Sequence, residues 1–191
     1  MPSSQPPPDD ALLRELAQIV GRDQLLTESS ELAVYECDGL THLRHTPRAV
    51  VLPKTTEEVA EIAKTCHRRQ VPFVARGAGT GLSGGALATA QGIIIHLSRM
   101  SDVLEVNRED RYAVVQVGLV NLHLSQKVAH RDLHFAPDPS SQVACTIGGN
   151  VAENSGGPHC LKHGNTTRHV LALKVVLPNC LLYTSPSPRD S

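Results

Sequence analysis

Aromatic residues are scarce in this chain of 191 residues: it has no tryptophan, two phenylalanines and three tyrosines, 3% of the sequence. Proteins that bind single-stranded nucleic acid stack bases on aromatic side chains, so this composition argues against that class. The net charge of −1 at pH 7 also offers no basic surface for a polyanion or an anionic membrane. The composition therefore predicts no nucleic-acid partner.

Long apolar segments are absent as well. No run approaches the roughly 20 residues that span a bilayer, and the N-terminal MPSSQPPPDD lacks the basic and apolar regions of a secretory signal. The five cysteines are odd in number and no two form a CxxC, which is typical of unpaired thiols in a reducing compartment. We therefore expect a soluble, cytoplasmic protein with no membrane span.

Glycine, in contrast, is concentrated in one stretch, Pro72–Gly85, with the sequence PFVARGAGTGLSGG. A short apolar run leads into Arg76, and five glycines follow within nine residues. Glycine lets backbone approach a ligand closely, and consecutive N–H groups in such a loop can converge on a phosphate. A flexible connector needs neither a strand leading into it nor an arginine at its start, so we favour a phosphate-binding loop.

The hydrophobic pattern around this loop predicts an α+β protein. A capping box of Thr55 and Glu58 marks the start of one helix, and Gly148-Gly149 is expected to open a short helical segment that stops at Gly156-Gly157. Helices are expected at 11–20, after Thr55 to an end near 68–70, and at 121–133. Strands are expected at 48–52, 71–75, 92–98 and 169–178, with a hairpin of 103–107 and 112–118.

The glycine loop does not match the Rossmann fingerprint, which is G-x-G-x-x-G at the start of a crossover helix. Here the spacing is Gly77-x-Gly79-x-Gly81, and only the seven residues ALATAQG separate Gly85 from the strand at Ile93. That is too short for a crossover helix. No Gly-Lys-Ser/Thr follows either, so a Walker A loop is also disfavoured.

Several motifs occur in order along the chain: VVLP, TEEV, RGAGTGLSGG, PDPSS, TIGGNVAENSGG and GNT. This combination resembles the FAD-linked oxidases of the vanillyl-alcohol-oxidase superfamily, in particular the glycolate oxidase FAD-binding subunit and related D-lactate dehydrogenases. The likeness covers roughly residues 35–179. It implies a PCMH-type FAD-binding domain of two α/β subdomains, about 46–100 and from 101 onward, with FAD between them.

The resemblance also implies which residues bind FAD. The loop Arg76–Gly85 would wrap the pyrophosphate through backbone N–H groups, Pro137–Pro139 would run along the flavin, and the later glycine segment would lie near the isoalloxazine and the phosphates. Gly148-Gly149 before a helical turn would offer free N–H groups to an anion. The implied cofactor-binding residues are Arg76, Gly77, Ala78, Gly79, Thr80, Gly81, Leu82, Ser83, Gly84, Pro137, Asp138, Pro139, Thr146, Gly148, Gly149, Asn150, Ala152, Asn154, Ser155 and Gly156.

Thr80 stands where superfamily members that attach flavin covalently often carry histidine. Threonine cannot form the histidyl link, so the resemblance implies noncovalent FAD.

The implied reaction is oxidation of a small 2-hydroxy acid, such as glycolate or D-lactate, to its 2-oxo acid, with electrons passed on to an acceptor or a partner oxidase subunit. In this family the catalytic base, substrate arginines and metal-binding histidines belong to a later cap domain. We therefore assign no catalytic residue and expect this chain alone to be inactive. The expected organisation is an N-terminal tail and helical lead-in (1–45), an incomplete FAD-binding domain, truncated at its C-terminal end (46–179), and a non-native or disordered tail (180–191).

Two other interpretations remain open. The chain can be a noncatalytic FAD-binding module of an oxidase complex. It can also be an NAD-binding Rossmann protein, an interpretation that NADH binding without a flavin spectrum would support. His159, His163 and His169 lie near Cys160, but their spacing matches no common zinc motif, so no metal is predicted. No Ser-His-Asp or Cys-His arrangement is visible, which disfavours nucleophilic catalysis.

Overall fold

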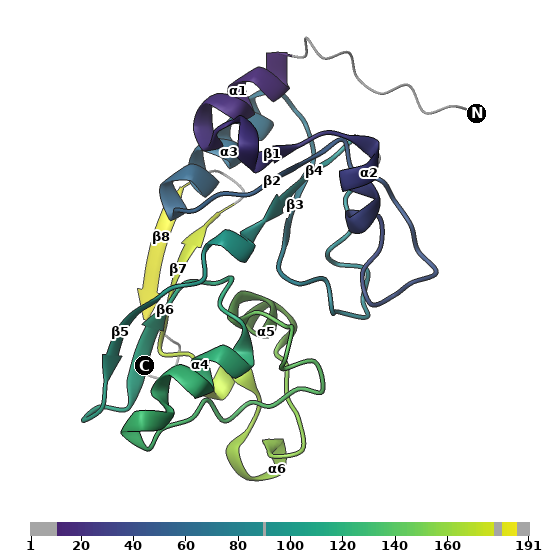
Figure 1. Ribbon diagram of the computed structural model, residues 1–191. Helices are drawn as coiled ribbons and strands as arrows, with labels where there is room; N and C mark the ends of the chain where they lie inside the picture. The colour runs from purple at the N-terminus through teal and green to yellow at the C-terminus, as the bar shows by residue number, and fades with distance from the viewer. Residues whose placement is uncertain (1–10, 90, 178–180, 187–191) are drawn as a thin grey trace. The chain divides into compact units, whose positions relative to one another are not determined.

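The computed structural model describes residues 11–89, 91–177 and 181–186. The chain forms two compact units (Figure 1). Among the described residues, the first unit comprises 11–76, 81–89, 91–97, 175–177 and 181–183, and the second comprises 77–80, 98–174 and 184–186. The predicted α+β class is confirmed, and the glycine loop is divided between the two units.

A four-stranded sheet forms the centre of the first unit, in the order β1-β2-β4-β3. Its strands are β1 (Leu25–Leu26), β2 (Ala49–Val51), β3 (Phe73–Arg76) and β4 (Ile93–His96). β2 and β3 both pair with β4 in parallel, and β1 pairs antiparallel with β2. The consecutive isoleucines of β4 are buried on both faces of the sheet, which suits a central parallel strand. The predicted β-α-β connection is present, but β4 lies between its two strands.

Side chains on the two faces of this sheet enter two different cores. Helices α1 (Ala11–Val20) and α3 (Thr56–Arg68) cover one face (Figure 1). The other face packs against the short helix α2 (Ser29–Leu32) and the segment near Ala88. Alternate residues of each strand take opposite faces. The first core contains Leu12, Leu16, Ala49, Val51, Ile62, Cys66, Ile93 and Ile95, and the second contains Leu32, Val50, Leu52, Ala88 and Ile94.

The predicted capping box of α3 is confirmed. Glu58 N donates to Thr55 Oγ1 over 3.1 Å, and Thr55 N donates to Glu58 Oε2 over 3.3 Å. At the other end of α3, Arg68 Nη2 lies 2.6 Å from Glu15 Oε2, and Arg69 also binds this carboxylate. The two guanidinium groups, Arg69 foremost, lower the pKa of Glu15 to about 2 and tie α3 to α1.

The second unit is built on an antiparallel hairpin and three helices. The hairpin pairs β5 (Val103–Asn107) with β6 (Tyr112–Val115), and its register is irregular between Val103 and Glu105. The helices are α4 (Asn121–Val128), α5 (Ile147–Glu153) and α6 (Cys160–His163). The core that the hairpin and helices share is centred on Leu119, Leu124 and Val128.

Helix α4 is shorter than predicted. A 3-10 turn (Ala129–Arg131) follows Val128, and Asp132 then takes a left-handed conformation with φ of 59°. The expected end at Leu133 is therefore wrong by about one turn, because a left-handed residue stops an α-helix.

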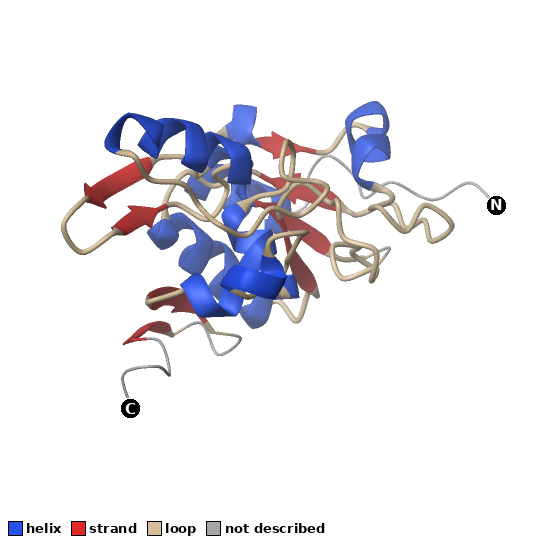
Figure 2. Ribbon diagram, turned by 90° about the horizontal axis from the view of Figure 1, so that it is seen from below, coloured by secondary structure: helices blue, strands red, loops and turns tan. Residues whose placement is uncertain are grey.

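Strands β7 (Ala172–Val176) and β8 (Leu182–Pro186) form a separate two-stranded sheet (Figure 2). The predicted strand 169–178 begins late because Thr166–His169 forms a 3-10 turn. Of the tail expected at 180–191, the structure describes residues 181–186, which carry β8, and the rest lies outside the described residues. Further 3-10 turns are Arg22–Gln24, Ala33–Tyr35 and Leu97–Arg99. Among the described helices, none has the length and apolar character needed to cross a membrane.

Candidate functional site

The glycine loop begins in the second unit, where Gly77 lies directly against Thr146. A Cβ added to Gly77 would overlap Thr146 Oγ1, so no larger residue fits without displacement. Gly79 has a φ of 72°, which L-residues rarely adopt. The start of the predicted loop is thus bare backbone next to a threonine hydroxyl.

The backbone N–H groups of Gly77–Leu82 make no hydrogen bond to any residue in the described ranges. Backbone donors in folded proteins are nearly always paired, and exposed loop donors pair with water or a ligand. A run of unused N–H groups is what an anion-binding loop requires.

The start of α5 differs from this pattern and from the prediction. Ile147 N donates to Leu119 O (2.8 Å) and Gly148 N to Val117 O (2.7 Å). Gly149 N donates to Thr146 Oγ1 over 3.2 Å, since Thr146 is the N-cap of the helix. The expectation that Gly148-Gly149 offers free N–H groups is therefore wrong: the helix begins one residue earlier, and its first donors are already used.

The small size of Gly148 has a packing reason instead. A Cβ there would lie 2.8 Å from the Cβ of Val117. The contact brings the start of α5 against the segment that follows β6. The sequence offered no sign of Val117 as a partner, because nothing in a local pattern reveals a contact across 31 residues.

Asn150 is fully buried in α5, and neither its Oδ1 nor its Nδ2 has a hydrogen-bond partner among the described residues. Burial raises the pKa of the neighbouring Cys145 thiol, and the Ser141 and Asn150 side chains oppose that rise. Leaving a buried amide unsatisfied costs about 1–3 kcal/mol. Asn150 therefore provides polar capacity beside the Cys145 thiol that no regular hydrogen bond uses.

The segment after α5 is held by Thr166, the last residue of the GNT motif, and by its neighbour Thr167. Asn154 is left-handed (φ 48°) and accepts a hydrogen bond from Thr167 N over 3.0 Å. The carbonyl of Ser155 accepts from Thr166 N (3.0 Å) and Thr166 Oγ1 (2.7 Å). Gly156 lies against the thiol of Cys160. The GNT motif marked this region, but only the structure shows that Thr166 and Thr167 fix the predicted loop.

The segment Pro137–Pro139 is fixed from two sides. Asn121, 1% exposed at the start of α4, donates from Nδ2 to Pro137 O over 3.0 Å. The carboxylate of Asp138 lies 2.5 Å from His159 Nδ1 and also accepts from His159 N over 3.3 Å. Asp138 is thus engaged with His159. Asn121 carries no motif and was missed by the sequence interpretation.

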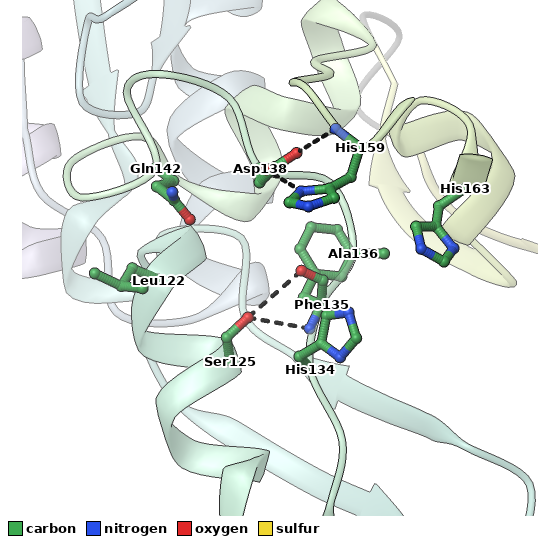
Figure 3. Close-up of a pocket in the computed structure, with 9 residues that line it drawn as sticks. All are labelled: Leu122, Ser125, His134, Phe135, Ala136, Asp138, Gln142, His159 and His163. Atoms are coloured by element: carbon green, nitrogen blue, oxygen red, sulfur yellow. Dashed lines mark hydrogen bonds and ion pairs between the residues drawn. The ribbon is translucent and has the colours of Figure 1, made fainter. Parts of the chain in front are cut away.

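A groove of about 260 Å³ lies beside this pair in the second unit (Figure 3). His134 adjoins Phe135 and Ala136, whereas His159 and His163 are the N-cap and the last residue of α6. Phe135 N donates to Ser125 Oγ over 3.0 Å. Its other lining residues are Leu122, Asp138 and Gln142. In the described part of the chain, no group of three or more His, Cys, Asp or Glu side chains is arranged to hold a metal ion.

Replacing Asp138 with asparagine is expected to remove a pH-dependent contribution to stability. The His159 side chain holds the pKa of Asp138 below its ordinary value of 3.8. A lowered carboxyl pKa contributes stability above the ordinary value, and this is lost as the pH falls through the lowered one. Urea unfolding of wild type and Asp138→Asn should therefore differ at pH 6, and the difference should shrink only as the pH falls below 3.8 and through the lowered pKa of Asp138.

The matched control is Asp132→Asn, which removes the same charge from a side chain that is 90% exposed and paired with Arg108 over 3.3 Å. Surface pairs of this kind contribute little. A pH dependence as large in Asp132→Asn as in Asp138→Asn would contradict the role of the Asp138–His159 pair.

The remaining predicted residues lie in the first unit. Gly81 has open space where a Cβ would be, and Leu82 is 72% exposed. Gly84 has a φ of 72° and packs near Leu40 and Leu43. Arg76 is buried at the end of β3. The second unit therefore brings Gly77–Thr80, Pro137–Pro139 and Thr146–Gly156 together, whereas Arg76 and Gly81–Gly84 belong to the first.

Comparison with known proteins adds an independent line of evidence. The family described as "FAD binding domain" matches residues 47–184. The glycolate oxidase subunit GlcD of Escherichia coli (strain K12) is 50% identical over 165 residues, which are 86% of this chain and 33% of that protein.

The names of two further relatives specify related substrates. D-2-hydroxyglutarate dehydrogenase of Stutzerimonas stutzeri (strain A1501) is 34% identical over 88% of this chain and 36% of its own length. D-lactate dehydrogenase of Anaerostipes hadrus is 39% identical over 69% of this chain and 28% of its own length. This chain therefore spans about a third of the length of the curated relatives it matches.

Solved structures agree on the fold. Alkyldihydroxyacetonephosphate synthase superposes with a TM-score of 0.84 at 24% identity, over 97% of this chain and 37% of that chain. p-Cresol methylhydroxylase superposes with a TM-score of 0.74 at 22% identity, over 91% of this chain and 34% of that chain. At these identities the likeness shows the fold alone.

Proposed function

This chain belongs to the FAD-binding domain family, and from that premise we propose that it forms the flavin-binding portion of an oxidoreductase that oxidises a small 2-hydroxy acid to the 2-oxo acid. The PCMH-type fold expected from the sequence is confirmed by the family match and the solved structures. The substrate class follows from relatives named as glycolate oxidase, D-lactate dehydrogenase and D-2-hydroxyglutarate dehydrogenase.

The observation that carries the proposal is the run of unused backbone donors at Gly77–Leu82. The FAD pyrophosphate is an anion that such a loop can bind through N–H groups alone. Gly77 and Gly79 leave this backbone without side chains, and the buried, unpartnered amide of Asn150 supplies further polar capacity in the second unit. The residues present therefore fit an FAD pyrophosphate.

In this proposal the residues of this chain bind and orient the cofactor, and bound FAD supplies the hydride acceptor for the hydroxy acid. Gly77–Leu82 would hold the pyrophosphate. Thr146, through its cap on α5, and Asn121, through Pro137, would keep the neighbouring segments in place. Thr80 at the position of a histidyl link supports a noncovalent cofactor.

The test is titration of the purified chain with FAD, followed by flavin fluorescence and absorbance. We expect saturable quenching at one FAD per chain and full release of flavin on denaturation. Failure to bind FAD under these conditions, with NADH bound instead, would overturn the proposal. Flavin that stayed with the denatured polypeptide would refute noncovalent binding.

The reaction is tested with the corresponding full-length protein, because this chain spans about a third of its relatives. A dye-coupled assay with glycolate, D-lactate and D-2-hydroxyglutarate should show turnover of at least one. Bound FAD without turnover of any 2-hydroxy acid would favour the alternative, a noncatalytic FAD-binding module of an oxidase complex.

A further inference from the structure

Arg76, the last residue of β3, is only 6% exposed, although it leads directly into the glycine loop. A buried guanidinium is costly unless acceptors surround it. From its position at the start of the glycine loop, the positive charge of Arg76 would be expected to bind phosphate. The hydrogen bonds of the side chain point to a different role.

The guanidinium is directed at backbone carbonyls of the first unit. Arg76 Nη2 donates to Cys37 O over 2.8 Å, and Nη1 donates to Tyr35 O and Ala86 O over 3.4 Å each. The group also lies 5.6 Å from the centre of the Tyr35 ring, within cation–π range. Burial lowers the Arg76 pKa, while the nearby Asp38, Cys37 and Tyr35 oppose that shift.

These contacts join the two ends of one loop. Arg76 immediately precedes the nine residues Gly77–Gly85, and Ala86 immediately follows them. The bond from Arg76 to Ala86 therefore closes the base of the loop, and the bonds to Tyr35 and Cys37 attach that base to the preceding turn. Because the loop is already closed before a ligand binds, less conformational entropy is lost on binding.

We propose that Arg76 is a positioning residue that clamps the base of the glycine loop and so presets its backbone N–H groups for the FAD pyrophosphate. The proposal rests on the proposed function for the identity of the ligand. The clamp itself is a property of the free chain and is testable without FAD.

The first experiment is amide hydrogen exchange of the free chain, comparing wild type with Arg76→Lys. Lysine keeps the charge but cannot reach three carbonyls from one planar group. Exchange should accelerate about tenfold at Leu40, His45 and Leu87, whose N–H groups bond to Asp38 Oδ1, Glu36 O and Gly84 O. Amides of α3 should be unchanged, and equal acceleration in α3 would overturn the proposal.

The second experiment is the salt dependence of FAD affinity in Arg76→Lys and Arg76→Gln. A clamp predicts that both variants weaken binding similarly, by about tenfold, with the wild-type slope of log Kd against log salt. A direct phosphate contact predicts that lysine retains affinity and that glutamine flattens the slope. The latter result would overturn the proposal.

Chemical rescue separates a lost clamp from a misfolded chain. Adding guanidinium to Arg76→Ala should restore slow exchange at Leu87 and FAD affinity, whereas ammonium should not. Absence of rescue at Leu87 would overturn the clamp. If guanidinium restored slow exchange at Leu87 in Arg76→Ala while the wild type bound no FAD, the proposed function would be refuted and the clamp retained.

Discussion

Replacing Gly77 with alanine is expected to weaken FAD binding about 100-fold. The added methyl would overlap Thr146 Oγ1, so either the loop or the N-cap of α5 must move. Overpacking costs about 1–3 kcal/mol, loss of an N-cap costs about 1 kcal/mol, and about 1.4 kcal/mol corresponds to a tenfold change in affinity. FAD titration of the variant by flavin fluorescence measures the effect.

Gly81→Ala is the matched control in the same loop. No atom lies within 4 Å of the position of its added Cβ. Its melting temperature should equal that of the wild type, whereas Gly77→Ala should melt several degrees lower. If Gly77→Ala kept both wild-type affinity and wild-type melting temperature, the close approach of this loop to Thr146 would be contradicted.

Replacing Ile94 with alanine is expected to lower the free energy of unfolding by about 2–5 kcal/mol. Ile94 is fully buried in β4, pairs with Val50 on one side and Val74 on the other, and packs in the core that includes Leu32 and Ala88. Truncation leaves a cavity that flanking strands cannot fill. Urea unfolding followed by far-ultraviolet circular dichroism measures the loss.

Val34→Ala is the control for this loss, since Val34 is apolar but 71% exposed. Surface substitutions of this kind usually stay within about 0.5 kcal/mol. Similar effects at Ile94 and Val34 would contradict the central place of β4 in the sheet.

Local features of the fold were predictable because their causes are local. The capping box of Thr55 and Glu58 and the apolar spacing of α3 act within a few residues of one another, and both are confirmed. The position of β4 between β2 and β3 was not predicted. It depends on pairings between residues far apart in the chain, which periodicity does not encode.

In the candidate site, too, local features were predictable and long-range contacts were not. The glycines at 77 and 79 were recognisable, and the unused N–H groups of that loop agree with the predicted role. The donors of Gly148 and Gly149 were misjudged because Val117 and the Thr146 hydroxyl occupy them. The partners of Arg76 were invisible for the same reason: Tyr35 and Cys37 are about 40 positions away.

The strand order of the first unit has a consequence for folding during synthesis. Ala49 and Phe73 both take Ile93 as their parallel partner. Neither β2 nor β3 can gain its central neighbour until the ribosome has released β4, well after the glycine loop has emerged. Until then α1 and α3 are exposed together with β3, which has no strand partner, and β2, which has only β1 as a partner; this is when holdase chaperones act on nascent chains. The order of strands thus delays completion of the sheet until β4 has emerged.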